Sequence, residues 1–307
     1  MALWNVVPRP WNDWSGGAAW IASCWSSQES WLQSQGGPQH LHGIFTLLGV
    51  TCFSLVADSL HIMELGVSHR VLGNVLFHLV ITRAFFTAAR AEDRLDQLWD
   101  LVKEEYGRLG TAARSRVPNL TMNMFSAAKG RSTNQPTLTT RVKAAETRHL
   151  VPVMFAIFSR LRRVRNAEDG HIMEVLKNLN SYYTTLTEQR QLVTLARGAQ
   201  QRLERSLWDL NRHYSALQSW ALQEGFVRWG VTIKFHMALH IALQSRYTNP
   251  TLTWTYMDED FMSIVKEVGE ACTHGTPGHL LVPKVLKRYI MGIDVRMNFA
   301  IDLDAMD

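Results

Sequence analysis

The chain has 307 residues, of which 46% are apolar and 19% charged. This balance is typical of a folded globular protein and excludes general disorder. Its 32 Lys and Arg against 27 Asp and Glu give a net charge of +5, which is compatible with a polyanionic partner but does not require one. Three widely spaced cysteines, Cys24, Cys52 and Cys272, are expected to be free thiols in a reducing, intracellular compartment.

Residues 1–42 form a Trp-rich amino-terminal segment that holds six of the eleven tryptophans among Pro, Gly, Ser and Gln. Such a segment is expected to drape over a folded domain and bury its large rings without regular structure. An aromatic surface for a partner is the alternative. A basic stretch followed by an apolar run is missing at the start, so no secretory signal is expected.

Residues 43–106 form a first core segment with two apolar runs. The run 43–57 stops at Asp58, short of the roughly 20 residues that span a bilayer. The run 71–89 carries polar groups that would be costly in hydrocarbon, namely Asn74, His78 and Arg83. No membrane association is therefore expected.

Within this segment, the residues leading to Asp58 fit a buried strand or a helix, because periodicity does not distinguish the two in a short apolar run. Apolar residues at helical spacing predict one helix over about 71–80 and another over about 95–106.

Residues 107–137 predict a long basic loop that mixes Gly, Pro, Ser, Thr and Asn with cations. It is interpreted either as an arm that contacts phosphates or as a solvated linker. Its cations are Arg108, Arg114, Arg116, Lys129 and Arg131.

Residues 138–226 predict a helical insertion. Proline is unfavourable inside a helix, so two helical pieces divided at Pro152 are expected first, followed by a helix over about 168–184 and a long one from Thr187 to Glu224. The second piece ends in a basic run that suits the carboxyl end of a helix dipole, made of Arg160, Arg162, Arg163 and Arg165.

Residues 227–307 predict a carboxyl-terminal core segment. His236 and His240 lie four apart on one helix and could share a metal, although the glutamate of the H-E-x-x-H pattern is missing. A zinc site would need Cys272 and His274 to join them; two partly buried histidines are the alternative. A β-prone run, 251–257, then leads to an acidic helix start at Asp258, Glu259 and Asp260.

These elements predict a mainly α-helical globular protein with at most two to four short strands, near 50–58 and 251–257. Carboxylates at the ends of two such strands, Asp58 and the acids 258–260, could together hold Mg²⁺. Helix-capping acids are the alternative interpretation.

The stretch VADSLHIMELGVSHRVLGNVL, residues 56–76, resembles the second-aspartate region of eukaryotic DDE transposases of the CACTA-like kind, which has the form D-x-x-H-x-x-x-L-G-V. KAAETRHLVP at 143–152 resembles the Arg-bearing helix of the all-helical insertion in that family. KFHMALH at 234–240 and WTYMDEDF at 254–261 are similar to the stretch that supplies its last catalytic acid. The resemblance covers about residues 40–300.

The resemblance implies a partial RNase H-like core in which carboxylates bind Mg²⁺ or Mn²⁺ for attack on a DNA phosphate. Asp58 would be the second carboxylate and Glu259 the third, with Asp258 and Asp260 as flanking alternatives. The family's first aspartate lies on an early strand, whereas only 57 residues precede Asp58. The chain thus resembles the carboxyl-terminal part of a transposase, and an incomplete metal site is expected.

The function expected from this resemblance is that of a transposase-derived, catalytically incomplete nuclear protein with weak, non-specific DNA binding. The alternative is a non-catalytic helical protein that binds other proteins. The residues expected to contact nucleic acid are Arg148, Arg162, Arg163, Lys129 and Arg131.

Overall fold

The computed structural model describes residues 13–14, 17–22, 28–34, 43–48, 50–51, 54–81, 85–125, 135–139, 141–164 and 166–304, without the side chains of 22, 28, 257–260 and 293–304. The chain divides into two compact units, Met1–Thr253 and Trp254–Asp307. The described residues are mainly helical and include no strand, which confirms the predicted mainly α fold. None of the helices in these ranges is both long and apolar enough to cross a membrane.

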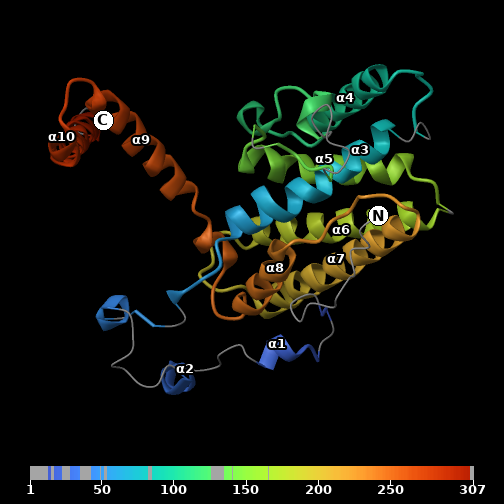
Figure 1. Ribbon diagram of the computed structural model, residues 1–307, viewed down its shortest axis with the longest axis horizontal. Helices are drawn as coiled ribbons and strands as arrows, with labels where there is room; N and C mark the ends of the chain where they lie inside the picture. The colour runs from blue at the N-terminus through green and yellow to red at the C-terminus, as the bar shows by residue number, and fades with distance from the viewer. Residues whose placement is uncertain are drawn as a thin grey trace. The chain divides into compact units, whose positions relative to one another are not determined.

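The first unit begins with two short helices, α1 (Ala19–Ala22) and α2 (Gln28–Ser34). A 3₁₀ turn, Gly43–Thr46, and then a π-helix, η5 (Leu60–Ser68), lead directly into α3 (His69–Ile81). Helix α4 (Ala91–Arg108) follows (Figure 1). Helices α3 and α4 confirm the two helices predicted for this region.

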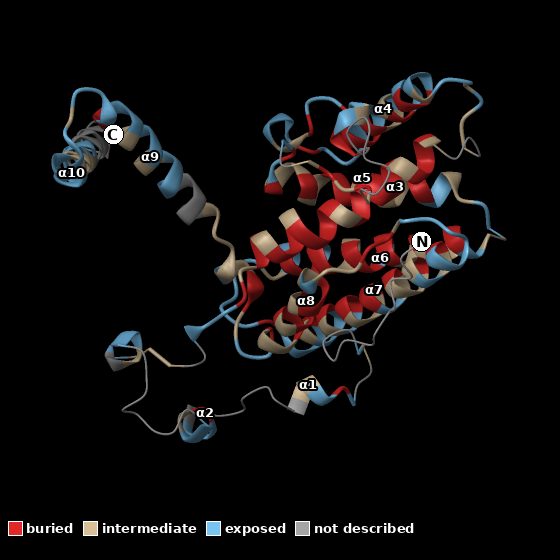
Figure 2. Cartoon of the chain, viewed as in Figure 1, coloured by how far each residue is buried: buried red, intermediate tan, exposed pale blue. Residues whose placement is uncertain are grey.

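Four longer helices complete the first unit: α5 (Ala144–Leu161), α6 (Ala167–Glu188), α7 (Arg197–Gln223) and α8 (Ile233–Gln244). Helices α6 and α7 pack along their lengths, with α5 against α6 and α8 against α7 (Figure 1). The π-helix η5 packs on α5 and α8. Their inward faces are buried and their outward faces exposed (Figure 2). On α3, for example, the residues at steps of three and four are fully buried, namely Val71, Leu72, Val75, Leu76, Leu79 and Val80.

The strand predicted near 50–58 is wrong for the part that the structure describes. The Gln244 side chain of α8 accepts a hydrogen bond from the Ala57 backbone N–H at 3.0 Å and donates one to the Leu55 carbonyl at 3.4 Å. A side chain thus occupies the backbone groups that a neighbouring strand would need. Near 251–257 the chain instead forms a 3₁₀ turn, Pro250–Thr253, and enters the next helix at Tyr256.

Two helix boundaries were also predicted wrongly. Helix α5 continues through Pro152. An interior proline costs about 3 kcal/mol, but its neighbours Val151, Val153 and Met154 are fully buried, and each such side chain contributes roughly 1.5–3 kcal/mol.

The expected helix from Thr187 to Glu224 is divided by a loop at 189–196. The buried Asn249 ties this loop down, because its side-chain amide donates to the carbonyls of Gln189 and Leu192, both at 2.8 Å. Helix α7 therefore starts only at Arg197.

Two close contacts hold α4 and the segment 135–139 against α3. The guanidinium of the buried Arg94, on α4, donates to the Val80 carbonyl in the last turn of α3 and to the carbonyls of Ala88 and Ala89. On another face of α3, a Cβ added at Gly73 would lie 2.3 Å from the Thr137 Cα. The backbone of 135–139 thus crosses α3 where only glycine fits.

The part of the expected basic loop that the structure describes is anchored to the first unit. Val117, Leu120 and Phe125 are buried, and the Arg116 guanidinium donates to the Thr111 carbonyl while lying over the Tyr106 ring. Between 111 and 125 the chain is therefore packed, and it does not form a free arm.

The second unit contains α9 (Tyr256–Thr273) and α10 (Gly278–Asp304), which pack against each other as a helical hairpin. The predicted acidic helix start is confirmed, because Asp258 and Glu259 lie in the first turn of α9. Cys272 is buried and free. Cys24 and Cys52 lie outside the described residues.

Candidate functional site

The motif residues Asp58 and His61 lie together where η5 begins. One Asp58 carboxylate oxygen accepts a hydrogen bond from the Leu60 backbone N–H at 2.9 Å, and the other lies 2.5 Å from Nδ1 of His61. Lys234, from α8, donates to the His61 carbonyl at 2.8 Å. Asp58 therefore caps a helix and pairs with a histidine three residues later.

Glu64 lies in the same π-helix and is fully buried. Neither of its carboxyl oxygens has a hydrogen-bond partner on another residue that the structure describes. Burial, only partly opposed by its own backbone N–H and the positive charge of Arg148, raises the pKa of Glu64 well above its ordinary value. A buried carboxyl group with a raised pKa on a π-helix is a combination often found at functional sites, and sequence reasoning missed it.

The other acids expected for metal binding lie in the second unit. Asp258 and Glu259 belong to α9, and their side chains lie outside the described residues. The grouping of these acids with Asp58 around Mg²⁺ or Mn²⁺ stays a prediction.

The residues expected to contact nucleic acid occupy different settings. Lys129 and Arg131 lie outside the described residues. Arg148 is half-buried near Glu64, whereas Arg162 lies just past the end of α5. Arg163 donates from Nε and Nη2 to both oxygens of Asp169, each at 2.9 Å, so its charge is already neutralised.

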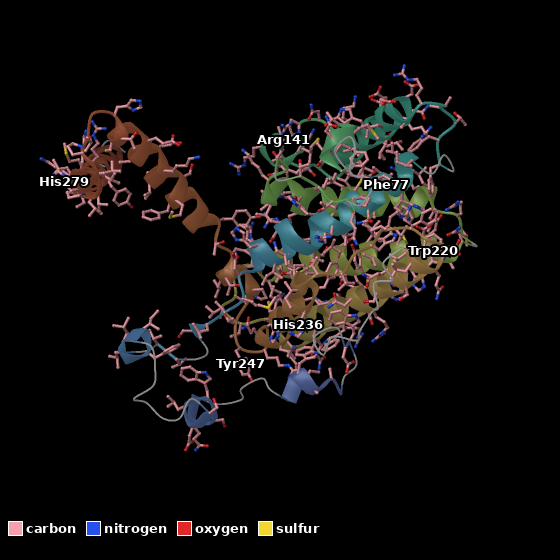
Figure 3. The ribbon with its side chains drawn as sticks, in the orientation of Figure 1. Phe77, Arg141, Trp220, His236, Tyr247 and His279 are labelled. Atoms are coloured by element: carbon pink, nitrogen blue, oxygen red, sulfur yellow. The ribbon has the colours of Figure 1, made fainter. Side chains whose placement is uncertain are left out.

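The predicted histidine pair of α8 does share one face. Nε2 of His236 and Nε2 of His240 lie 2.9 Å apart. The Trp20 ring of α1 packs on both imidazoles, with centroid distances of 4.6 and 5.2 Å, and stacks on Trp208; His236 is marked in Figure 3. Trp14 donates to the Ser215 hydroxyl at 2.6 Å. Trp14 and Trp20 thus pack on the long helices as predicted, whereas the expected lack of regular structure is wrong for α1 and α2.

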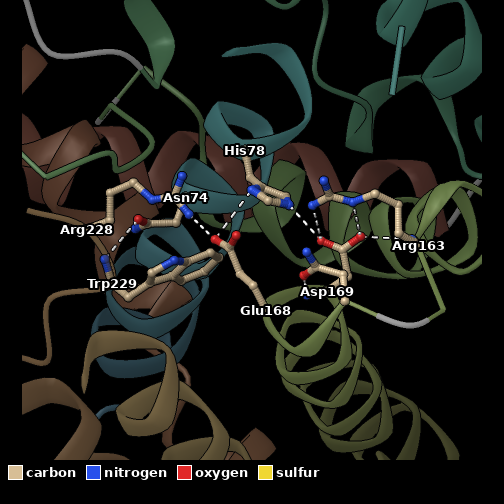
Figure 4. Close-up of polar contacts among 8 residues, drawn as sticks. Asn74, His78, Arg163, Glu168, Asp169, Arg228 and Trp229 are labelled. Atoms are coloured by element: carbon tan, nitrogen blue, oxygen red, sulfur yellow. Dashed lines mark hydrogen bonds and ion pairs between the residues drawn. The ribbon is translucent and has the colours of Figure 1, made fainter. Parts of the chain in front are cut away.

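A second cluster, which sequence reasoning did not find, lies inside the first unit (Figure 4). His78 of α3 lies between two acids that begin α6: its Nε2 is 3.0 Å from Asp169 and its Nδ1 is 3.5 Å from Glu168. All three side chains are buried. Each acid also binds an arginine, because Arg163 pairs with Asp169 and Arg228 pairs with Glu168. We call these five residues the buried ionic cluster.

Local structure explains how the cluster forms. Asn166 caps α6 by accepting the Asp169 backbone N–H at 2.9 Å, and acids are favourable in the first turn of a helix. The Asn74 side chain, one turn before His78, accepts the Trp229 backbone N–H at 3.1 Å and so holds the segment that carries Arg228. Burial alone would raise the pKa of Asp169, but hydrogen bonds from His78 and Arg163 outweigh it and hold that pKa well below its ordinary value.

The donor atoms of His78, Glu168 and Asp169 lie within 4.8 Å of one another, close enough to bind one metal ion. However, two guanidinium groups already balance the two carboxylates. A divalent cation would therefore lie beside two positive charges, and this cluster is better suited to joining α3, α6 and the segment before α8.

No model of a known protein family matches the chain, and comparison with curated proteins and with solved structures likewise gives no significant match.

Proposed function

We propose that this chain is a transposase-derived helical protein that does not cut DNA and that binds nucleic acid weakly through the phosphate backbone. The proposed origin rests on the D-x-x-H-x-x-x-L-G-V stretch, matched by Asp58, His61, Leu65, Gly66 and Val67.

The local setting of Asp58 carries the proposed loss of catalysis. Two-metal phosphoryl transfer needs carboxylate oxygens that are free to bind both ions. Here one oxygen accepts the Leu60 N–H and the other pairs with His61. The Lys234 ammonium, bound to the nearby His61 carbonyl, adds positive charge that acts on Asp58.

Nucleic acid binding is supported by a surface that we call the α4–α5 basic corner, made of Arg108, Arg160, Arg162 and Glu105. Arg108 and Arg160 both pair with the single carboxylate of Glu105. Arg162 has no carboxylate partner among the described residues. Three guanidinium groups against one acid leave a local excess of positive charge suited to phosphates.

The test is fluorescence anisotropy of a short labelled DNA duplex with the full chain, titrated between about 50 and 200 mM salt. The double variant Arg160→Ala and Arg162→Ala should bind more weakly and reduce the slope of log K against log salt by about one for each phosphate that is no longer neutralised. The matched control, Arg190→Ala with Arg197→Ala, removes two exposed arginines elsewhere in the unit. Equal effects of the two double variants, or binding insensitive to salt, would contradict the proposal.

One observation favours the alternative, protein-binding function. The α9–α10 hairpin carries large apolar side chains that are exposed by 43 to 64%, and grouped exposed apolar residues often mark protein interfaces. They are Phe261, Met262, Leu280, Val282, Leu286, Ile290 and Met291. Sedimentation velocity of the full chain tests this: association that is lost in Leu286→Glu with Ile290→Glu supports the alternative, and a monomer at all concentrations argues against self-association.

A further inference from the structure

A pair of histidines lies across the interface of α6 and α7, away from the buried ionic cluster. Nδ1 of His171, on α6, is 2.9 Å from Nδ1 of His213, on α7, and the ring centroids are 5.2 Å apart. Both imidazoles are half-buried. One ring must donate its proton to the other at this distance, so both Nδ1 atoms point at the same small volume.

The spacing of these atoms is close to that of two metal ligands. Two imidazole nitrogens on one tetrahedral Zn²⁺ lie about 3.3 Å apart, given Zn–N bonds of about 2.0–2.1 Å. The pair would need to open by only a few tenths of an ångström. A metal ion would then take the place of the shared proton.

Two carboxylates lie one helical turn from the histidine pair, although among the described residues no carboxyl oxygen lies within 4.8 Å of both imidazole rings' nitrogens. Helices α6 and α7 are antiparallel, since Arg202 pairs with Glu188 and Ser206 with Ser181 along the same interface. Glu174 lies three residues after His171, and Asp209 lies four residues before His213. In antiparallel helices both positions fall on the same side of the pair, one turn away.

Both acids act on His213 through their charge. Burial, more than the neighbouring charges of His171 and Arg212, lowers the pKa of His213, and Glu174 and Asp209 both oppose that shift.

Neither acid is committed to a buried partner. Glu174 pairs with Lys177 at 3.0 Å and Asp209 with Arg212 at 2.9 Å, both on the same helix and partly exposed. Ion pairs of this kind stabilise little, so rotation of either side chain toward a cation at the histidine pair would cost little.

Two other clusters fit a metal less well. In the buried ionic cluster, Arg163 and Arg228 occupy the carboxylates. The His236–His240 pair has the same 2.9 Å separation, but tryptophan packs on its rings and no charged group other than its own partner shifts the pKa of His240.

We propose that His171 and His213, with Glu174 and Asp209, form a site for a divalent transition metal of the zinc class that links α6 to α7. The two imidazoles supply the nitrogen ligands, and the carboxylates and water complete the coordination. The site is independent of nucleic acid binding.

The experiment is isothermal titration of Zn²⁺ into the full chain after removal of any affinity tag, paired with Co²⁺ absorption spectroscopy to report tetrahedral coordination. One equivalent should bind, and the melting temperature should rise with the metal. His171→Ala and His213→Ala should each abolish both effects, whereas the matched control His236→Ala with His240→Ala should retain them.

Variants of the acids keep the test informative if a histidine variant fails to fold. Glu174→Gln with Asp209→Asn removes the charges but preserves side-chain size, and should weaken Zn²⁺ binding by about 10–100-fold. No binding to the wild type would overturn the proposal. Zn²⁺ binding unchanged in the His171 and His213 variants, or lost in the His236 and His240 control, would overturn it as well.

Discussion

Two buried acids of the first unit, Asp169 and Glu64, lie in different hydrogen-bonding environments. In the buried ionic cluster, the Asp169 carboxylate accepts hydrogen bonds from the backbone N–H and the side chain of Arg163 and pairs with His78. Glu64 is equally buried, but within the described part of the chain its carboxyl oxygens have no hydrogen-bond partner on another residue. The first arrangement favours a charged acid, and the second favours a neutral one.

Asp169→Ala should destabilise the protein strongly, because it leaves His78 and Arg163 without their shared carboxylate. Breaking a buried ion pair from one side typically costs about 3–5 kcal/mol. The measurement is urea denaturation at pH 7. The control, Asp100→Ala, removes a 74% exposed acid paired with Lys103 and should change the free energy of unfolding by at most about 1 kcal/mol. Similar effects for the two variants would show that the cluster does not stabilise the fold.

Glu64 should make stability fall as pH rises. Its folded pKa lies well above 4.5, so between pH 4.5 and that folded pKa the native state binds more protons than the unfolded state. The contribution to stability is full below pH 4.5 and is lost toward the folded pKa, by up to about 1.4 kcal/mol per pH unit.

The check compares urea denaturation of wild type and Glu64→Gln from pH 4.5 to 8. The stability of wild type relative to the variant should decline steadily with pH, whereas Glu104→Gln, at an exposed position, should run parallel to wild type. Parallel curves for Glu64→Gln would mean that this carboxyl group is ionised in the folded protein.

At the level of residues, the sequence revealed some partners of the site residues and not others. His78 was visible as a polar residue in an apolar run, but its partners Glu168 and Asp169 lie ninety residues away and look like ordinary first-turn acids. The His171–His213 pair was equally hidden, since only the pairing of α6 with α7 brings the rings together. Spacing reveals partners within one helix, such as His236 and His240, and does not reveal partners on two.

At the level of elements, hydrophobic periodicity predicted a helix correctly where one face of that helix packs on a continuous core. It predicted α3, α4 and most of α6. It failed where a distant side chain binds the backbone: Gln244 holds 55–57 out of a strand, and Asn249 interrupts the expected long helix at 189–196. It also failed at Pro152, where buried neighbours outweigh the cost of a proline.

Two glycines in helices provide a matched test of packing. Gly73→Ala should destabilise the protein by roughly 1–3 kcal/mol, because the added Cβ meets the Thr137 backbone, which cannot rotate away. Gly107→Ala, on α4 with nothing within 4 Å, should instead be neutral or stabilise by up to about 1 kcal/mol through helix propensity. Thermal denaturation of both variants checks this. Stabilisation by both would mean that 135–139 does not cross α3 closely.

At the level of the whole molecule, the two units contribute different surfaces. The first offers the α4–α5 basic corner, and the second offers the apolar side chains of α9 and α10. The sequence predicted mild basicity and a mainly helical fold. It also predicted nucleic acid contacts by Arg148, Arg162, Arg163, Lys129 and Arg131, which stay a prediction. In the structure Arg163 binds Asp169, and Arg116 binds its own loop. Charge composition alone does not tell which cations are already neutralised.

In the proposed function, the chain retains the Asp58 motif but does not cut DNA. The most direct measurement is a supercoiled-plasmid nicking assay of the purified full chain with Mn²⁺, run beside Asp58→Ala and Glu259→Ala. The proposed function predicts no nicking or strand transfer above the level of either variant, because Asp58 is engaged by Leu60 and His61. Nicking by the wild type that both substitutions abolish would contradict it, and would show that a complete metal site forms around these acids.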